Sequence, residues 1–291
     1  MGHHATHQQQ TSLHDLLRCQ GGDVNVERDY DPDGTPGYPG EGRKDAEEYT
    51  LAVSEELSDL QERLYASGLT DAEHALSVLV VLQGLDTAGK GGVIRHALGT
   101  MDPQGIHVHA FKAPTQEEKQ HDFLWRVERE LPRPGQIAIF DRSHYEDVLI
   151  QRVEQMAAPE EIERRYDAIN QFEAATAARG TRIIKCFLHV SRAEQKSRLM
   201  ARLENKEKFY KFNPDDVDTA QRWDQYMEAY SLALTRCNTP VAPWYVIPSD
   251  HKWYRNWAVA TLLTEELRSL SLTWPEPDFD LAAQKARVQA L

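Results

Sequence analysis

The sequence predicts an α/β fold: a doubly wound, parallel β-sheet of about five strands flanked by helices. Two observations support this prediction. Short apolar runs alternate with longer segments of helical periodicity, which is typical of right-handed βαβ crossovers. In addition, a glycine-rich loop directly follows the first apolar run, Ser77–Gln83. We find no internal repeat, so we expect one α/β domain.

Five apolar runs are expected to form the strands. The run SVLVVLQ is uncharged and bounded by Gly84, as in a strand buried on both faces. The run IHVHAF alternates, and QIAIF ends at Asp141. RIIKCFLH and WYVI complete the set. In order, the expected strands cover residues 77–83, 106–111, 136–140, 182–189 and 244–247.

Helices are expected between and around these strands. The first places Leu57, Leu60 and Leu64 on one stripe, and Gly68 is expected to end it. The others follow from the same periodicity. In order, the expected helices cover residues 44–67, 91–98, 116–130, 159–179, 192–203, 216–235 and 253–270. The segment 29–42 is crowded with Pro, Gly and Asp, so we expect an irregular arm or disorder there.

Composition narrows the class of protein. The 291 residues include 33 basic and 46 acidic side chains, which gives a net charge of −13. No apolar run approaches the ~20 residues of a membrane span, and no signal peptide is visible, so we expect a cytoplasmic protein with no membrane partner. An acidic chain also argues against nucleic acid as a partner. Three cysteines without CxxC spacing indicate neither a disulfide framework nor a zinc site.

The loop GLDTAGKG over residues 84–91 matches the phosphate-binding pattern GxxxxGK after a strand and before a helix. Its backbone N–H groups and the Lys90 ammonium are expected to hold phosphates. Gly91 stands where a Ser or Thr usually holds Mg²⁺, so Asp86 is expected to bind the metal or to orient the attacking phosphate. The alternatives are a glycine-rich turn without a ligand and a turn or cap aspartate. The expected phosphate-binding residues of the loop are Gly84, Ala88, Gly89, Gly91 and Gly92.

A second carboxylate follows the third expected strand. Asp141 and Arg142 come at its carboxyl end, where ligands bind in open α/β sheets. Asp141 is expected to share Mg²⁺ with Asp86, and Arg142 to neutralise a transferring phosphoryl group. A strand-end salt bridge is the alternative. Glu146 and Asp147 are expected to contact a nucleotide or a second metal, although acidic residues also open helices as ordinary caps.

A basic stretch follows the fourth expected strand. Residues 181–211 contain nine basic and three acidic side chains, a local charge of +6, so the remaining chain carries −19. Arg198 and Arg202 lie four residues apart and share one helix face, which Lys206 continues. This pattern predicts a mobile lid that closes over phosphates, with an ordinary solvated helix face as the alternative.

Five motifs occur in the order seen in one family: LQGLDTAGKGG, FKAPTQEE with HDFLWR, FDRSHYEDVLI, KFNPDD before RWDQYMEAY, and APWYVIPSDHKWYRNW. Over roughly residues 44–270 the chain resembles the type-2 polyphosphate kinase family. The resemblance implies a P-loop kinase fold, Mg²⁺ or Mn²⁺ as cofactor, and a homo-oligomer, either a dimer or a tetramer. By position, Asp86, Lys90, Asp141 and Arg142 match the catalytic residues, and Arg198, Arg202 and Lys211 fall in the lid.

The resemblance also implies the reaction. The stretch SHYEDVLI looks like the class III subgroup, in which an acidic residue at Glu146 accompanies the use of both nucleoside mono- and diphosphates. We therefore expect phosphoryl transfer from inorganic polyphosphate to AMP and ADP, reversibly with ATP. An ATP-dependent nucleoside or nucleotide kinase and a catalytically silent polyphosphate- or nucleotide-binding protein remain alternatives. Tyr210, where a tryptophan is usual, and NKE at 205–207 depart from the family pattern in the lid.

The expected domain organisation combines these predictions. Residues 1–43 form a tail and arm that are partly disordered, and the histidines of the tail indicate a disordered segment more than a metal site. Residues 44–275 form the P-loop kinase domain, with the lid at about 198–222. Residues 276–291 form a C-terminal tail.

Overall fold

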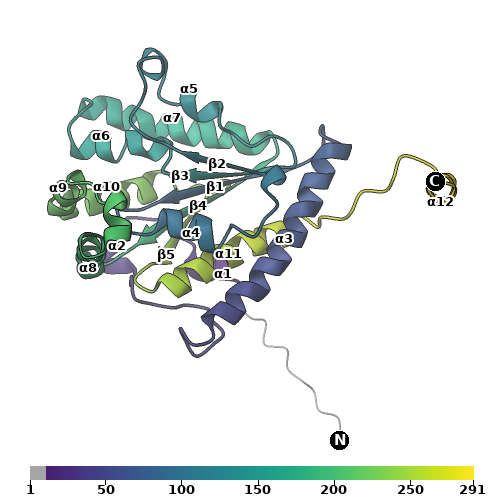
Figure 1. Cartoon of the computed structure of the whole chain (residues 1–291). Helices are drawn as coiled ribbons and strands as arrows, with labels where there is room; N and C mark the ends of the chain where they lie inside the picture. Colours follow the sequence, from purple (N-terminus) through teal and green to yellow (C-terminus); the bar gives the residue numbers. More distant parts are fainter. Residues whose placement is uncertain (1–10) are drawn as a thin grey trace, which may run out of the picture.

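The computed structural model describes residues 11–291 and contains a five-stranded sheet (Figure 1). Its strand order is β2-β3-β1-β4-β5, and the four pairings are parallel. The expected doubly wound α/β fold is confirmed. Because β1 lies beside β3, the loops that follow these two strands emerge next to each other at the carboxyl edge. His3, His4 and His7 lie outside the described residues.

The elements have the following bounds. The strands are β1 (Ser77–Gln83), β2 (Ile106–Ala110), β3 (Ile137–Asp141), β4 (Thr181–His189) and β5 (Trp244–Pro248). The α-helices are α1 (Leu13–Leu17), α2 (Val26–Asp29), α3 (Ala46–Thr70), α4 (Lys90–His96), α5 (Trp125–Glu128), α6 (Ile150–Val153), α7 (Pro159–Ala178), α8 (Arg192–Leu203), α9 (Asp215–Gln221), α10 (Trp223–Arg236), α11 (Lys252–Ser269) and α12 (Leu281–Gln289). The 3₁₀ turns are η1 (Pro103–Gly105), η2 (Glu118–Gln120), η3 (His144–Asp147) and η4 (Lys206–Lys211).

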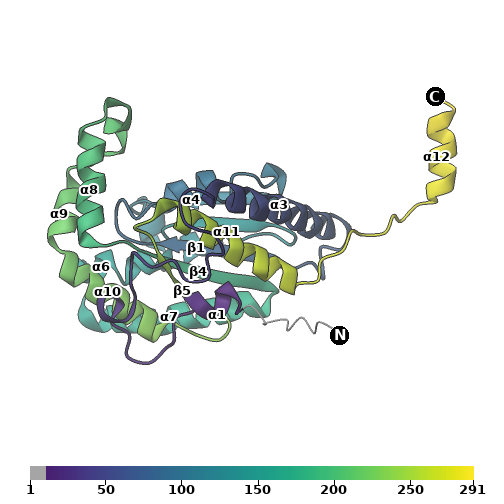
Figure 2. The ribbon, with the colours of Figure 1, turned by 90° about the horizontal axis from the view of Figure 1, so that it is seen from below.

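Helices cover both faces of the sheet and create two apolar cores (Figures 1 and 2). Because side chains alternate along a strand, Val78, Val80 and Leu82 of β1 enter the core beneath α3, α4 and α11. Leu79 and Val81 enter the core beneath α7 and α10. β1 is buried along its whole length, which explains its continuous apolar run.

The segment that precedes residue 44 belongs to the packed unit. Leu13 and Leu17 are buried in one core and Val26 in the other. The backbone N–H groups of Leu13 and His14 donate to the Glu265 carboxylate at 3.0 and 3.1 Å. The irregular stretch that follows lies over the start of α11, where Tyr254 donates to the carbonyl of Pro36 at 2.8 Å. The packed unit therefore begins N-terminal to the expected start of the kinase domain.

Two expected helices are interrupted, which corrects those predictions. Residues 116–130 form η2 and α5 instead of one helix, because His121 is extended and Asp122 accepts from the backbone of Leu124 to start a new turn. Residues 216–235 divide into α9 and α10 at Arg222, whose ψ of 24° ends the first helix. At the first break a side chain hydrogen-bonds to the backbone. At the second break the backbone of one residue departs from helical geometry.

Gly68 does not end its helix, because α3 continues to Thr70. A Cβ on Gly68 would lie 2.5 Å from the carbonyl oxygen of Pro134, so the glycine permits close approach of the loop before β3. At the other end of the chain, α12 stands apart from the body (Figure 2). Within residues 11–291, no helix is long and apolar enough to cross a membrane.

Candidate active site

The loop between β1 and α4 contains three residues in left-handed conformations. Gly84 and Gly89 have φ values of +152° and +108°, and Thr87 also has a positive φ of +69°. These left-handed conformations favour glycine. A Cβ on Gly89 would collide with the guanidinium of Arg255. The glycines therefore allow both the tight turn and the approach of an arginine behind it.

Lys90 begins α4 and points back into the loop. Its ammonium donates to the carbonyl oxygen of Gly84 at 2.7 Å, and the residue is only 9% exposed. This contact holds a positive charge inside the turn. A role of Lys90 in phosphate binding stays a prediction.

Arg142 joins the two sequence-predicted carboxylate positions. Asp141 ends β3 in register with Leu82 of β1, and the next residue, Arg142, adopts a positive φ of +64°. Its guanidinium contacts Asp86 Oδ1 at 3.1 Å. Burial lowers the pKa of Arg142, but the charges of Glu146, Asp86 and Asp141 raise it further, so the net shift is upward. The structure thus gathers three predicted carboxylates, Asp86, Asp141 and Glu146, around the guanidinium of Arg142.

Glu146 lies in the turn η3, next to this cluster. Burial raises its pKa, while Arg142, Lys90 and a hydrogen bond with Gln83 oppose that shift. Glu146 therefore faces the same space as the loop lysine and Arg142. Its carboxyl group is desolvated by burial, which is the largest cause of the raised pKa.

Asp147 points to a different neighbour. Its carboxylate contacts the guanidinium of Arg165 on α7 at 3.3 Å, and Arg165 also stacks over Phe123. Burial raises the pKa of Asp147 to about 6, although Arg165 opposes the shift. The structure therefore ties Asp147 to α7 and does not bring it to Asp86 and Arg142.

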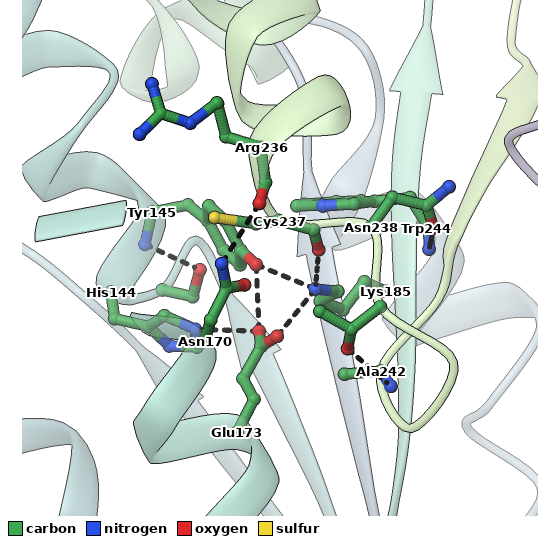
Figure 3. A network of polar contacts seen from close by, with 12 residues as sticks. His144, Tyr145, Asn170, Glu173, Lys185, Arg236, Cys237, Asn238, Ala242 and Trp244 are labelled. Atoms are coloured by element: carbon green, nitrogen blue, oxygen red, sulfur yellow. Dashed lines mark hydrogen bonds and ion pairs between the residues drawn. The ribbon is translucent and has the colours of Figure 1, made fainter. Parts of the chain in front are cut away.

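A buried polar network holds the turn that carries Glu146 (Figure 3). The Lys185 ammonium of β4 donates to Glu173 Oε2 of α7 at 2.7 Å, to the Tyr145 hydroxyl at 2.7 Å, and to the carbonyl of Cys237 at 2.6 Å. Glu173 Oε1 accepts from Tyr145 at 2.9 Å and lies 3.2 Å from His144 Nε2. Burial raises the pKa of Glu173, but Lys185 and His144 outweigh it and lower the pKa. The contacts of His144 and Tyr145 with Glu173 and Lys185 therefore hold η3 against α7 and β4.

Two arginines brace the loop from behind, and the sequence did not indicate this role for either. Arg198 is 7% exposed and donates to the carbonyls of Thr87 and Ala88 in the loop, and to those of Ser249 and Asp250 after β5. Its Nε donates to Glu194 at 2.7 Å. All five N–H donors of the guanidinium are thereby engaged within the protein. Arg198 therefore lies beneath the loop and not on an open lid face.

Arg255 completes this support. It lies on α11 and donates to the carbonyl of Ala88 at 3.0 Å and to Asn256 Oδ1 at 2.8 Å. Burial and the nearby charge of Arg198 lower its pKa. In the sequence, Arg255 stands within the aromatic cluster WYRNW. An arginine between aromatic residues of a buried helix is the one local signal that could have indicated its buried contacts.

Comparison with known proteins identifies the family of this chain. The model of the family "Polyphosphate kinase 2 (PPK2)" matches residues 42–272. The chain belongs to the polyphosphate kinase 2 family. The match includes all of the predicted site residues, from Gly84 to Lys211. The expected family and the expected class of phosphotransferase are confirmed.

Individual relatives agree with this assignment. The chain is 44% identical over 249 residues to the "AMP/ADP-polyphosphate phosphotransferase" of Meiothermus ruber, covering 86% of this chain and 91% of that protein. It is 43% identical over 234 residues to the "ADP-polyphosphate phosphotransferase" of Rhodopseudomonas palustris, covering 76% and 79%. The crystal structure of polyphosphate kinase 2 from Arthrobacter aurescens superposes with a TM-score of 0.93 at 45% identity, covering 97% of this chain and 98% of that one.

The predicted lid lies in an arm made of α8, η4 and α9 (Figure 2). Arg202 of α8 contacts Asp216 of α9 at 2.8 Å and donates to the carbonyl of Lys211 at 2.8 Å. Burial and the charge of Asp86 raise the pKa of Asp216. Arg202 thus links α8 to η4 and α9 within the arm. The Lys211 ammonium lies over the exposed ring of Tyr210.

The basic stretch 181–211 is less uniform than its charge suggests. Lys185 is fully buried in the network beneath η3. Arg182 lies at the amino end of β4, opposite the loop, and pairs with Glu266 at 3.3 Å. Together with Arg198, these residues account for three of the nine positive charges. The sum of +6 therefore overstates the positive charge that the lid presents.

Proposed function

We propose that this chain transfers the terminal phosphoryl group of inorganic polyphosphate to AMP and ADP, in a reversible reaction. One observation carries the proposal: Arg142 holds Asp86 and lies beside Asp141 and Glu146, next to the phosphate loop. The arrangement supplies cations and carboxylates at the carboxyl edge of the sheet, where a transferring phosphoryl group would sit.

The residues have distinct roles in this proposal. A P–O bond of polyphosphate breaks and a new one forms to a phosphate oxygen of the nucleotide, so the protein mainly orients the groups and stabilises charge. Lys90, with the backbone N–H groups of Gly84, Gly89 and Gly91, would hold one phosphate chain. The N–H groups of Ala88 and Gly92 already donate to the carbonyls of Leu85 and Gly89, so we do not assign them to phosphate. Arg142 would stabilise the charge of the transferring group, and Asp86 would orient the accepting phosphate.

Asp86 and Asp141 fit a divalent cation by their donor chemistry. Both are carboxylates, and Mg²⁺ is commonly held by one or two carboxylates together with substrate phosphates. Mn²⁺ accepts the same oxygen donors. Bound Mg²⁺ would neutralise phosphate charge and help to position the reacting groups. Arg142, at 3.1 Å from Asp86, keeps that carboxylate oriented toward the site.

The lid residues Arg202 and Lys211 are proposed to contact the polyphosphate chain after the arm closes. Arg198 is proposed to act indirectly, since its donors hold the loop and the segment after β5.

We also propose that the enzyme is cytoplasmic and works as a homo-oligomer, a dimer or a tetramer. Asp147 contacts Arg165. We propose that it helps to position the turn η3, which carries Glu146, and does not bind the nucleotide directly.

Glu146 is proposed to decide whether a nucleoside monophosphate is accepted. The proposal rests on the resemblance to the class III subgroup and on the position of Glu146 near the charges of Arg142 and Lys90. Relatives of similar identity differ in the nucleotides for which they are named: AMP and ADP in Meiothermus ruber, and ADP alone in Rhodopseudomonas palustris. In Glu146→Asn, we expect AMP use to fall at least about tenfold relative to ADP use, which corresponds to about 1.4 kcal/mol. Initial rates with each nucleotide, polyphosphate and Mg²⁺ measure this ratio. An unchanged ratio would contradict the role of Glu146.

A donor and acceptor panel tests the reaction itself. The purified chain is supplied with polyphosphate or ATP as sole donor, and with AMP, ADP, GMP or GDP as acceptor. We expect product with polyphosphate and both adenine nucleotides, and little turnover of Asp86→Asn. Phosphorylation of AMP that depends on ATP and not on polyphosphate would favour an ATP-dependent nucleotide kinase. Tight polyphosphate binding without turnover would favour a silent binding protein.

A further inference from the structure

Two histidines and a glutamate converge on the exposed edge of the sheet, away from the phosphate loop. His107 and His109 alternate with Val108 on the edge strand β2, so their side chains share one face. Glu130, in the turn after α5, lies between them. His107 Nε2 is 2.6 Å from Glu130 Oε2, and His109 Nδ1 is 3.1 Å from the same oxygen.

The three side chains form a set of ligand atoms with the composition of a first-row transition-metal site. Their nitrogen and oxygen atoms all lie within 4.8 Å of one another. Two imidazoles and one carboxylate are a common set of protein ligands for Zn²⁺, with a water in the fourth position. In such a site the ligand atoms lie about 3.4 Å apart, given metal–ligand bonds of about 2.1 Å. A small outward movement of Glu130 would lengthen its distances to the two imidazole nitrogens, now 2.6 and 3.1 Å, toward that spacing.

The surroundings leave the cluster available to a cation from solvent. The side chains of His107, His109 and Glu130 are 43%, 33% and 26% exposed. The nearby Arg126 is engaged elsewhere, with Glu118 and with the carbonyl of Lys112. The carboxylate of Glu130 thus faces the two imidazoles, which are its ion-pair partners within residues 11–291.

We propose that His107, His109 and Glu130 bind a Zn²⁺-like transition-metal ion at a site separate from the Mg²⁺ used in phosphoryl transfer. Imidazole ligands favour Zn²⁺, Ni²⁺, Cu²⁺ or Co²⁺ over Mg²⁺, which prefers oxygen donors. Metal binding uses the ring nitrogens that face Glu130, so each neutral imidazole keeps its proton on the other nitrogen. The strand pairing places His109 opposite Phe140, one residue before Asp141.

Zn²⁺ titration of the full chain tests the site. The metal-stripped protein is titrated by calorimetry in the presence of excess Mg²⁺, because Mg²⁺ should not compete. We expect His107→Ala/His109→Ala to lose one bound Zn²⁺ per chain relative to the unsubstituted protein. Any binding by His3, His4 and His7 is common to both proteins and cancels in the difference.

His74→Ala provides a matched control. His74 is an exposed histidine that contacts one carboxylate, Asp71, at 3.0 Å, so it offers a histidine–carboxylate pair without a second imidazole. We expect this variant to bind as much Zn²⁺ as the unsubstituted protein. An equal loss in His74→Ala, or no loss in the double variant, would overturn the proposal.

Glu130→Gln keeps both histidines and tests the carboxylate separately. Each variant is first compared with the unsubstituted protein by thermal unfolding in the presence of a chelator, which reports on folding without metal. We expect Zn²⁺ to raise the Tm of the unsubstituted protein more than that of Glu130→Gln. We also expect Co²⁺ to give the visible absorption of low-coordinate Co²⁺, weakened in Glu130→Gln. Identical shifts and spectra for the two proteins would overturn the proposed ligand set.

Discussion

Gly91 and Gly92, two adjacent glycines at the start of α4, differ in the space available to an added side chain. A Cβ on Gly91 would meet no atom within 4 Å, whereas a Cβ on Gly92 would lie 2.8 Å from Arg255 Nη2. Both residues lie in α4. The pair therefore separates the effect of helix propensity from the effect of displacing Arg255.

Gly91→Ala is expected to raise the free energy of unfolding by about 0.5–1 kcal/mol, because alanine loses less backbone entropy in a helix than glycine. Gly92→Ala should instead move Arg255 off the carbonyl of Ala88, lower the Tm and reduce turnover. Thermal unfolding and initial rates of the two variants measure the difference. Equal behaviour of Gly91→Ala and Gly92→Ala would show that Arg255 does not constrain the loop.

A titratable residue next to the site gives a second prediction. The pKa of Asp147 is raised to about 6 by burial, above the ~3.9 of an unfolded aspartate. The folded chain therefore holds this proton more tightly, and its contribution to stability decreases as the pH rises from about 4 to about 6. Asp147→Asn should remove that contribution. We expect the Tm gain of the variant to be larger at pH 7.5 than at pH 4.5; a gain that did not depend on pH would contradict the shift.

At the scale of elements, the turn η3 depends on a strand and two helices that are distant in sequence. Lys185 of β4 and Glu173 of α7 are 0% and 1% exposed, and they meet beneath Tyr145 of the turn. Removing one member of a buried ion pair leaves an uncompensated charge. The network therefore couples the packing of α7 on the sheet to the position of Glu146.

Glu173→Gln is expected to lower the free energy of unfolding by about 3–5 kcal/mol. Glu56→Gln is the matched control, because Glu56 pairs with Arg268 at the surface, where an ion pair contributes at most about 1 kcal/mol. Denaturant unfolding of both variants measures the costs. A cost for Glu173→Gln no larger than that of the control would argue against a tight network.

Sequence patterns predicted the strands and the loop but not the supports behind them. The apolar run of β1 and the glycines that follow are local signals, so the central strand and the turn were predictable. Arg198 and Arg255 act through carbonyls 111 and 167 positions away in the chain. No local pattern encodes such contacts. The expected helix 116–130 was wrong for a different reason. The break at Asp122 depends on one local side-chain hydrogen bond, which helical periodicity does not reveal.

At the scale of the whole molecule, the two ends of the chain contribute differently. Leu13 and Leu17 are each 3% exposed. In the C-terminal segment, Phe279, Leu281 and Val288 are 52%, 49% and 67% exposed. The side-chain hydrogen bonds of that segment join its own residues. The N-terminal segment is therefore part of the domain, while residues 276–291 add little to the stability of one chain.

Deletion of residues 276–291 is expected to leave the Tm of the remaining chain unchanged. Leu13→Ala, by contrast, should lower the free energy of unfolding by about 2–5 kcal/mol, because it removes a buried side chain. Thermal unfolding and size-exclusion chromatography of both proteins test this contrast. A large drop in Tm on deletion, together with a smaller particle, would mean that α12 stabilises an assembly of several chains.

The segment that precedes α3 also constrains the order in which the native contacts of the protein can form. Leu13 and His14 donate to Glu265, Cys19 to the carbonyl of Trp244, and Val26 to Ser231. These partners are synthesised more than 200 residues later. Native burial of Leu13, Leu17 and Val26 therefore requires that residues 231–265 have been synthesised. Closure of the native fold around this segment is thus a late step in the folding of the chain.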